Sequence, residues 1–192
     1  MSEETDEAIA IRVQQGQQEA FGELIRRYSA KLSRYARKFL FDTEDAQDVI
    51  QDVFIKAYEN IQSFDASRRF SPWIYRIAHN EFVNALKKRQ ASRTVFAFDI
   101  DTLVPHLAST DTADSAALER DVRAAIENHL ETIAPKYKEP LILYYLEDMD
   151  YKEISDILQI PVSTVGVRLA RARRMLQEAA KNDKHLRDTN LL

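Results

Sequence analysis

Four polar side chains in the first half of the chain have the types and spacing needed to contact nucleic acid. They follow one another at steps of four, four and three residues, which places them on one face of a helix. The set is Arg76, Asn80, Asn84 and Lys87. Asparagine offers a donor and an acceptor together, as a base edge requires, and cationic side chains suit phosphates. An ordinary solvated face is the alternative interpretation.

Two aromatic residues, Phe64 and Trp73, flank the loop that leads into this helix. A ring in this place can stack on or wedge against an unpaired base. Base–aromatic stacking contributes about 1–3 kcal/mol, comparable with the few kcal/mol needed to unstack one base. The alternative is that the rings belong to the hydrophobic core. We favour the core for Phe70, and both interpretations stay open for Phe64 and Trp73.

A second basic face lies near the C-terminus. Val165, Leu169, Ala172 and Leu176 recur at steps of four, three and four and predict the inner stripe of a helix. Its outer side carries Ser163, Thr164, Val167, Arg168, Arg171 and Arg174.

A short helix with its own start and stop signals precedes this basic helix. Asp150 and Glu153 have the spacing of a capping box, and Pro161 disfavours helical geometry at Ile160. A short helix, a tight turn and a longer basic helix predict a helix-turn-helix whose second helix enters the major groove. A helical hairpin with a solvated basic face is the alternative. Gly166 weakens the prediction, since glycine inside a helix costs about 1 kcal/mol relative to alanine.

A third set of polar residues has the opposite charge. Asp48, Gln51 and Asp52 lie on the outward side of a predicted helix. They would repel phosphates but suit a basic protein surface. A solvated face remains the alternative, because acids are also favoured near a helix start.

Apolar residues at three- and four-residue steps predict the elements that position these groups. The N-terminal helices span about residues 18–40, 42–61 and 70–90, and the third has Ser71 as its N-cap and Pro72 at its first helical position. The predicted core stripes of the first two include Ile25, Phe54 and Tyr58. A segment rich in Ser, Thr, Asp and Ala follows and predicts a flexible linker. The C-terminal helices are predicted at 117–133, from Pro135 or Pro140 to about 147, at 150–158 and at 162–181. The predicted fold is all-α: two small helical domains, 1–92 and 117–192, joined by linker 93–116.

Basic and acidic side chains are distributed unevenly along the chain. Residues 66–93 carry seven basic and one acidic side chain, and residues 162–181 carry five and one. Residues 1–65 carry eight basic and thirteen acidic side chains, and residues 94–161 carry five and fourteen. Two short cationic segments in a chain of net charge −4 suggest two localised contacts with a polyanion. Two solvated helix faces are the alternative, and charge alone does not decide between them.

Composition excludes several other classes of protein. The 192 residues include no cysteine, so disulfides and thiolate chemistry are excluded, and the four histidines show no metal-ligand spacing. No segment approaches the roughly 20 apolar residues of a membrane span, and the acidic N-terminus does not resemble a signal peptide. We expect a cytoplasmic protein without cofactor, metal site, small-molecule substrate or membrane insertion.

Three segments together resemble the extracytoplasmic-function sigma factors of bacterial RNA polymerase. Residues 45–58 are similar to that family's polymerase-binding helix, residues 70–80 to its reader of the promoter −10 element, and residues 148–174 to its −35 reader. The resemblance covers roughly residues 10–92 and 117–181. Two positions depart from the family pattern: the counterpart of Gly166 is commonly basic, and that of Ala170 is often larger.

The resemblance implies a transcription initiation factor that does no covalent chemistry, binds core RNA polymerase, recognises both promoter elements and helps to open the duplex. It implies polymerase contacts at Asp48, Gln51, Asp52 and Phe54, with the clamp helices of the largest subunit and the flap as partners. It assigns −10 DNA contacts to Phe64, Trp73, Arg76, Asn80, Asn84 and Lys87. It assigns −35 DNA contacts to Ser163, Thr164, Val167, Arg168, Arg171 and Arg174. Such proteins are often controlled by an anti-sigma factor.

Two other functions compete with this interpretation. A stand-alone regulator would use only the C-terminal helix-turn-helix, but it would not need the cationic segment 66–93. A helical hydrolase could use the clustered acids Glu44, Asp45, Asp48 and Asp52. Paired carboxylates need a buried site or a metal to shift their pKa values, and these acids are predicted to face outward.

Overall fold

The fold comes from a computed structural model that describes residues 4–40, 43–92, 129–130 and 133–189. The chain divides into an N-terminal unit containing residues 1–99 and a C-terminal unit formed by most of residues 100–192. Every regular element among the described residues is a helix, so the predicted all-α class is confirmed. The predicted linker and almost all of the helix predicted at 117–133 lie outside the described residues, and the domain boundaries stay predictions.

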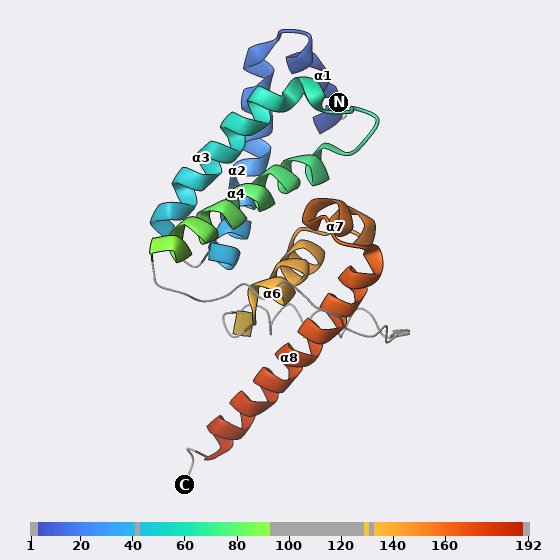
Figure 1. The fold of residues 1–192 in the computed structure, drawn as a ribbon. Helices are drawn as coiled ribbons and strands as arrows, with labels where there is room; N and C mark the ends of the chain where they lie inside the picture. Colours follow the sequence, from blue (N-terminus) through green and yellow to red (C-terminus); the bar gives the residue numbers. More distant parts are fainter. Residues whose placement is uncertain (1–3, 41–42, 93–128, 131–132, 190–192) are drawn as a thin grey trace. The chain divides into compact units, whose positions relative to one another are not determined.

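The N-terminal unit is a bundle of three long helices with a short helix packed against it (Figure 1). Its elements are α1 (Asp6–Gln14), η1 (Gln18–Ala20), α2 (Phe21–Leu40), α3 (Thr43–Asn60), η2 (Ile61–Ser63) and α4 (Phe70–Ser92). Helices α2, α3 and α4 pack against one another, and α1 packs against α2 and α4. The three long helices therefore enclose one core, as their apolar spacing predicts.

Aromatic rings fill the centre of this core. The ring centroid of Tyr35 on α2 lies 5.4 Å from that of Tyr75 and 4.8 Å from that of Phe82, both on α4. All three side chains are fully buried. Two members of the predicted stripes are instead surface residues: Ile25 and Tyr58 are each 37% exposed. Both lie at the edge of their stripe, where helical spacing alone does not separate core from surface.

Helix α1 was not predicted, because it is only nine residues long and has no extended apolar stripe. The Thr5 hydroxyl caps its start by accepting the Ala8 N–H at 3.2 Å. Its end has paired hydrogen bonds from Gly16 N–H to the Val13 carbonyl and from Gln17 N–H to the Arg12 carbonyl, both at 3.0 Å. This Schellman arrangement requires a left-handed residue, and Gly16 supplies it with φ of 97°.

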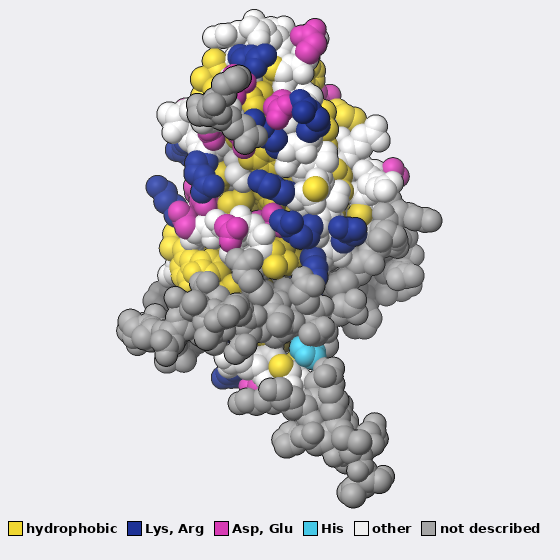
Figure 2. Space-filling model, turned by 180° about the vertical axis from the view of Figure 1, so that it is seen from behind, with side chains coloured by type: hydrophobic (Ala, Val, Ile, Leu, Met, Phe, Trp, Pro, Cys, Tyr) yellow, Lys and Arg dark blue, Asp and Glu magenta, His cyan; other side chains and the backbone are white. Residues whose placement is uncertain are grey.

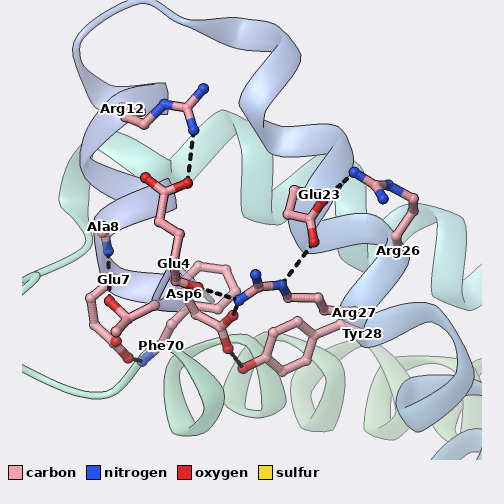
Figure 3. Close-up of polar contacts among 11 residues, drawn as sticks. Glu4, Asp6, Glu7, Ala8, Arg12, Glu23, Arg26, Arg27, Tyr28 and Phe70 are labelled. Carbon is pink, nitrogen blue, oxygen red and sulfur yellow. Dashed lines mark hydrogen bonds and ion pairs between the residues drawn. The ribbon is translucent and has the colours of Figure 1, made fainter. Parts of the chain in front are cut away.

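A polar cluster fastens α1 to α2 (Figure 3). The Asp6 carboxylate accepts from the Arg27 guanidinium at 2.7 Å through one oxygen and from the Tyr28 hydroxyl at 2.6 Å through the other. Arg27 also donates to the Glu4 carbonyl at 2.7 Å and to Glu23 at 2.9 Å. Burial and the hydrogen bond to Asp6 raise the pKa of Tyr28 above its ordinary value. The phenol therefore remains a donor throughout the neutral range.

The C-terminal unit contains α6 (Pro135–Leu141), the π-helical turn η4 (Ile142–Leu146), α7 (Tyr151–Leu158) and α8 (Val162–Thr189). Helix α6 begins at Pro135, where a missing N–H costs nothing. Pro140 lies inside this helix, so the alternative start at Pro140 is wrong. Helix α8 extends beyond the predicted end near residue 181.

Helices α7 and α8 form the predicted helix-turn-helix. The Asp150 carboxylate accepts the Glu153 N–H at 2.8 Å, and the Glu153 carboxylate accepts the Asp150 N–H at 2.9 Å, which completes the capping box. The turn passes through Gln159 in the left-handed region, with φ of 55°. All four residues of the predicted inner stripe of α8 are fully buried: Val165, Leu169, Ala172 and Leu176.

No described helix combines the length and apolar character needed to cross a bilayer. Within the same ranges, no group of three or more His, Asp or Glu side chains could hold a metal ion.

Two glycines predict opposite effects of an added methyl group. A Cβ on Gly166 in α8 would lie 3.6 Å from the Tyr151 ring, an ordinary contact, so Gly166→Ala should stabilise the protein by about 1 kcal/mol. The matched change Gly16→Ala places a side chain at a left-handed position and should destabilise it by about 1 kcal/mol. Urea unfolding of both variants measures the two changes. Effects of the same sign would contradict this account.

The Tyr28 hydrogen bond predicts a pH-dependent stability. Tyr28→Phe should lower the free energy of unfolding by about 1 kcal/mol at neutral pH. Because folding raises the pKa of this phenol, its contribution is complete below the ordinary tyrosine pKa of about 10 and declines as pH rises above it. Urea unfolding at a series of pH values should therefore show the gap between wild type and variant narrowing in alkali. A gap that stays constant or widens would refute the assignment.

Candidate nucleic-acid interface

The polar face of α4 forms as its spacing predicts. The side chains of Arg76, Asn80, Asn84 and Lys87 are all exposed. The opposite face packs Ile74, Ala78 and Phe82 fully into the core. The two asparagine amides and two cationic groups therefore share one accessible surface, which is the geometry that reading a nucleic acid would need. Their role in DNA binding stays a prediction.

The aromatic residues beside α4 are placed differently from one another. Phe64 is 5% exposed and Phe70 is fully buried, with their ring centroids 5.3 Å apart in an edge-to-face arrangement. The ring centroid of Trp73 lies 5.3 Å from the ring centroids of both Phe64 and Phe70, and the Trp73 side chain is only partly buried. The burial of Phe64 among its neighbours favours the core interpretation of this ring, and a direct base contact of Phe64 stays a prediction. Trp73 keeps an accessible surface.

The loop between these rings, residues 64–69, is folded into a compact turn. The Asp65 carboxylate accepts the Ser67 backbone N–H at 3.0 Å and the Ser67 hydroxyl at 2.7 Å. These hydrogen bonds and the nearby Arg68 guanidinium lower the pKa of Asp65. Asp65, Ser67, Arg68 and Arg69 are exposed. This turn was not predicted, although an aspartate two residues before a serine is a signal for it.

Helix α1 holds both ends of the 64–69 loop. The Gln14 amide donates to the carbonyls of Ile61 and Phe64, each at 2.8 Å. The Glu7 carboxylate accepts the Phe70 N–H at 2.9 Å at the start of α4. Helix α4 begins one residue before the predicted N-cap Ser71, so that cap is corrected and a side chain from α1 fills the role. These contacts span 47 to 63 residues, and no local pattern signals them.

The outer face of α8 is accessible along the predicted residues. Ser163, Arg171 and Arg174 are exposed, and Thr164, Val167 and Arg168 are partly exposed. Arg171 donates to the Tyr137 hydroxyl of α6 at 3.1 Å. The Arg174 guanidinium lies 3.4 Å from the Glu178 carboxylate. The face thus presents small polar groups in its first turn and guanidinium groups farther along.

The acidic face of α3 contains three of its four predicted residues. Asp48, Gln51 and Asp52 are exposed, whereas Phe54 is 9% exposed and belongs to the core. The burial of Phe54 agrees with its place in the predicted apolar stripe, and the polymerase contact that the resemblance implies for it stays a prediction. Ile55, one residue further along, is 48% exposed and was missed. It follows Asp48 and Asp52 at steps of four and three, so it lies on the same face.

Helix α2 carries a cationic surface that the charge analysis missed. It has six basic side chains and one acidic one: Arg26, Arg27, Lys31, Arg34, Arg37, Lys38 and Glu23. Figure 2 shows Lys and Arg side chains spread over one face of the N-terminal unit. Averaging charge over residues 1–65 concealed them, because acidic segments lie on both sides of α2.

Comparisons with known proteins agree with this arrangement. Residues 24–92 match the family described as Sigma-70 region 2, and residues 123–176 match Sigma-70 region 4. The chain is 33% identical to the ECF RNA polymerase sigma-E factor of Haemophilus influenzae over 90% of this chain and 94% of that protein. It is 32% identical to the ECF sigma factor SigW of Bacillus subtilis, covering 92% of this chain and 94% of SigW.

Two solved structures have a similar fold. The structure of CnrH in complex with the cytosolic domain of CnrY gives a TM-score of 0.69 at 26% identity, covering 94% of this chain and 99% of that one. The structure of the sigma factor RpoE of Bartonella quintana, solved with the anti-sigma factor NepR, gives a TM-score of 0.62 at 26% identity. The match covers 84% of this chain and 96% of that one. The full-length sequence relatives, together with the two region matches, lead to one assignment. The chain belongs to the extracytoplasmic-function family of RNA polymerase sigma factors.

Proposed function

We propose that this sigma factor binds core RNA polymerase through α3 and reads promoter DNA through α4 and α8. The observation that carries the proposal is the separation of charge: amide and cationic groups cover the α4 face, hydroxyl and guanidinium groups cover the α8 face, and acids cover the α3 face. In this proposal residues 1–92 form the domain that binds the polymerase and the −10 element, and residues 117–192 form the domain that binds the −35 element. Residues 93–116 are the linker between the two domains. The chain acts in the cytoplasm and catalyses no reaction of its own.

The α3 face suits a protein partner. Its exposed apolar residue, Ile55, lies in line with Asp48 and Asp52, and an apolar contact with a charged rim is the common composition of a protein interface. The acids would be repelled by DNA but attracted to a basic surface. We assign this face to the clamp helices of the largest polymerase subunit. The flap is the proposed partner of the C-terminal domain.

The α4 face suits the −10 element. Asn80 and Asn84 can pair with base edges, while Arg76 and Lys87 neutralise phosphates. Trp73 is the aromatic residue placed to stack on a base, with Phe64 packed behind it. Phe64 therefore supports the stacking surface in this proposal and does not form it.

The α8 face suits the −35 element. The first turn of a recognition helix meets base edges, which assigns that role to Ser163, Thr164 and Val167. Arg168, Arg171 and Arg174 follow on the same side and can reach phosphates. We also propose control by an anti-sigma factor, since the fold is similar to that of RpoE of Bartonella quintana, which was solved with NepR.

A reciprocal pair of variants tests the division between α4 and α3. Asn80→Ala should impair opening of a matched promoter and leave affinity for core polymerase nearly unchanged, because only a base contact is removed. Asp52→Arg should weaken polymerase binding and leave the α4 face intact. Opening is measured by permanganate footprinting and polymerase affinity by fluorescence anisotropy. The same defect in both variants would contradict the proposal.

The phosphate contact of Arg171 predicts a change in salt dependence. Arg171→Ala should reduce the slope of log affinity against log salt concentration by about 1 for holoenzyme on promoter duplex. Arg171→Lys is the matched control, because it keeps the charge and should keep the slope. An unchanged slope for Arg171→Ala would contradict the proposal that Arg171 contacts a DNA phosphate.

A further inference from the structure

We propose that α1 acts as a brace that presets the shape of the 64–69 loop, and that Gln14 is the positioning residue through which it acts on DNA selectivity. The inference rests on the proposed function, since it assumes that this loop meets DNA beside α4. It adds a determinant of base selectivity that lies on a helix without any predicted DNA contact.

The loop has the composition of a recognition element anchored at both ends. Phe64 and Phe70 are buried at its two ends. Between them, exposed polar side chains offer donors and acceptors directly before the α4 face. If the backbone of this loop keeps one conformation, its donors and acceptors hold fixed positions, so only base edges that match them are fully hydrogen-bonded. A preset loop also avoids part of the conformational entropy cost of becoming ordered when DNA arrives.

Gln14 supplies that constraint on the N-terminal side. An amide nitrogen has two N–H donors, and in Gln14 both are used, on the carbonyls of Ile61 and Phe64. The Gln62 amide returns a hydrogen bond to the Gln14 carbonyl at 3.2 Å. Gln14 is partly buried, so these bonds are partly shielded from competition by water. These hydrogen bonds fix the backbone at the end of η2, where the 64–69 loop begins, relative to α1.

Glu7 supplies the constraint on the C-terminal side by accepting the Phe70 N–H. Helix α1 itself is held on α2 through Asp6, Arg27 and Tyr28 (Figure 3). The loop is therefore fixed relative to the bundle at both ends. Removing the Gln14 donors should release one end without opening the core, because the rings of Phe64, Phe70 and Trp73 still pack together.

The test uses the full chain in holoenzyme with core polymerase and compares Gln14→Met with Gln15→Met. Methionine keeps the length of glutamine but donates no hydrogen bond. Gln15 is the matched control because it is the next residue and its side chain is exposed. The probes are short single-stranded DNA oligonucleotides selected from a random library by wild-type holoenzyme, together with versions that carry single-base replacements. Polymerase affinity and the unfolding midpoint are measured in parallel.

We expect Gln14→Met to lose about tenfold in discrimination at one or more base positions. Polymerase affinity should stay at the wild-type level, and Gln15→Met should behave as wild type. Gln14→Lys, whose ammonium group can donate to both carbonyls, should retain discrimination. This combination separates a positioning role from a general loss of stability, which would weaken every probe and polymerase binding together.

The other outcomes overturn the inference in distinguishable ways. If Gln14→Met keeps wild-type discrimination, the brace is refuted while DNA reading by α4 stands. If Gln14→Met loses binding to all probes and to polymerase alike, Gln14 is a folding residue and the positioning role is refuted. If wild-type holoenzyme itself shows no base preference, the proposed function fails and the inference fails with it.

Discussion

Packing of aromatic rings between α2 and α4 is the constraint on which the exposed polar face of α4 depends. Tyr75 and Phe82 are seven residues apart on α4 and both contact the buried ring of Tyr35. Their burial fixes the rotation of α4 about its own axis. Because Asn80 and Asn84 lie on the opposite side of that helix, they must face solvent. A helix rotated by one residue would bury an amide and break the stripe, so core packing and the exposed polar face of α4 are specified together.

Much of this arrangement could be predicted from sequence because it is local. The inner stripe of α8, the capping box of Asp150 and Glu153, and the exposed face of α4 follow from helical spacing and capping rules. The differences occur at the edges of the stripes, where Ile25 and Tyr58 are each 37% exposed although spacing places them in the core. Spacing places Phe54 in the core, where it lies, and only the resemblance assigns it a polymerase contact. Ile55, the next residue, is exposed.

The features that the sequence did not reveal are long-range or concealed by averaging. The contacts of Glu7 and Gln14 with the 64–69 loop join residues about fifty positions apart or more, so neither end predicts the other. Helix α1 has too few residues to give a clear stripe. The basic face of α2 was concealed because charge was averaged over a window much longer than one helix.

Separation of charge explains how one small chain can contact two partners of different kinds. Cationic and amide groups on α4 and α8 attract a polyanion such as DNA, whereas the acids around Ile55 on α3 repel it. DNA therefore binds poorly to the α3 face, and a basic protein surface binds poorly to the faces of α4 and α8. The most direct measurement places a photo-crosslinking amino acid at position 80 or position 52 in holoenzyme bound to promoter DNA. The account predicts that position 80 crosslinks to DNA and position 52 to the largest polymerase subunit. Crosslinking of both positions to the same partner, or the reverse pattern, would contradict it.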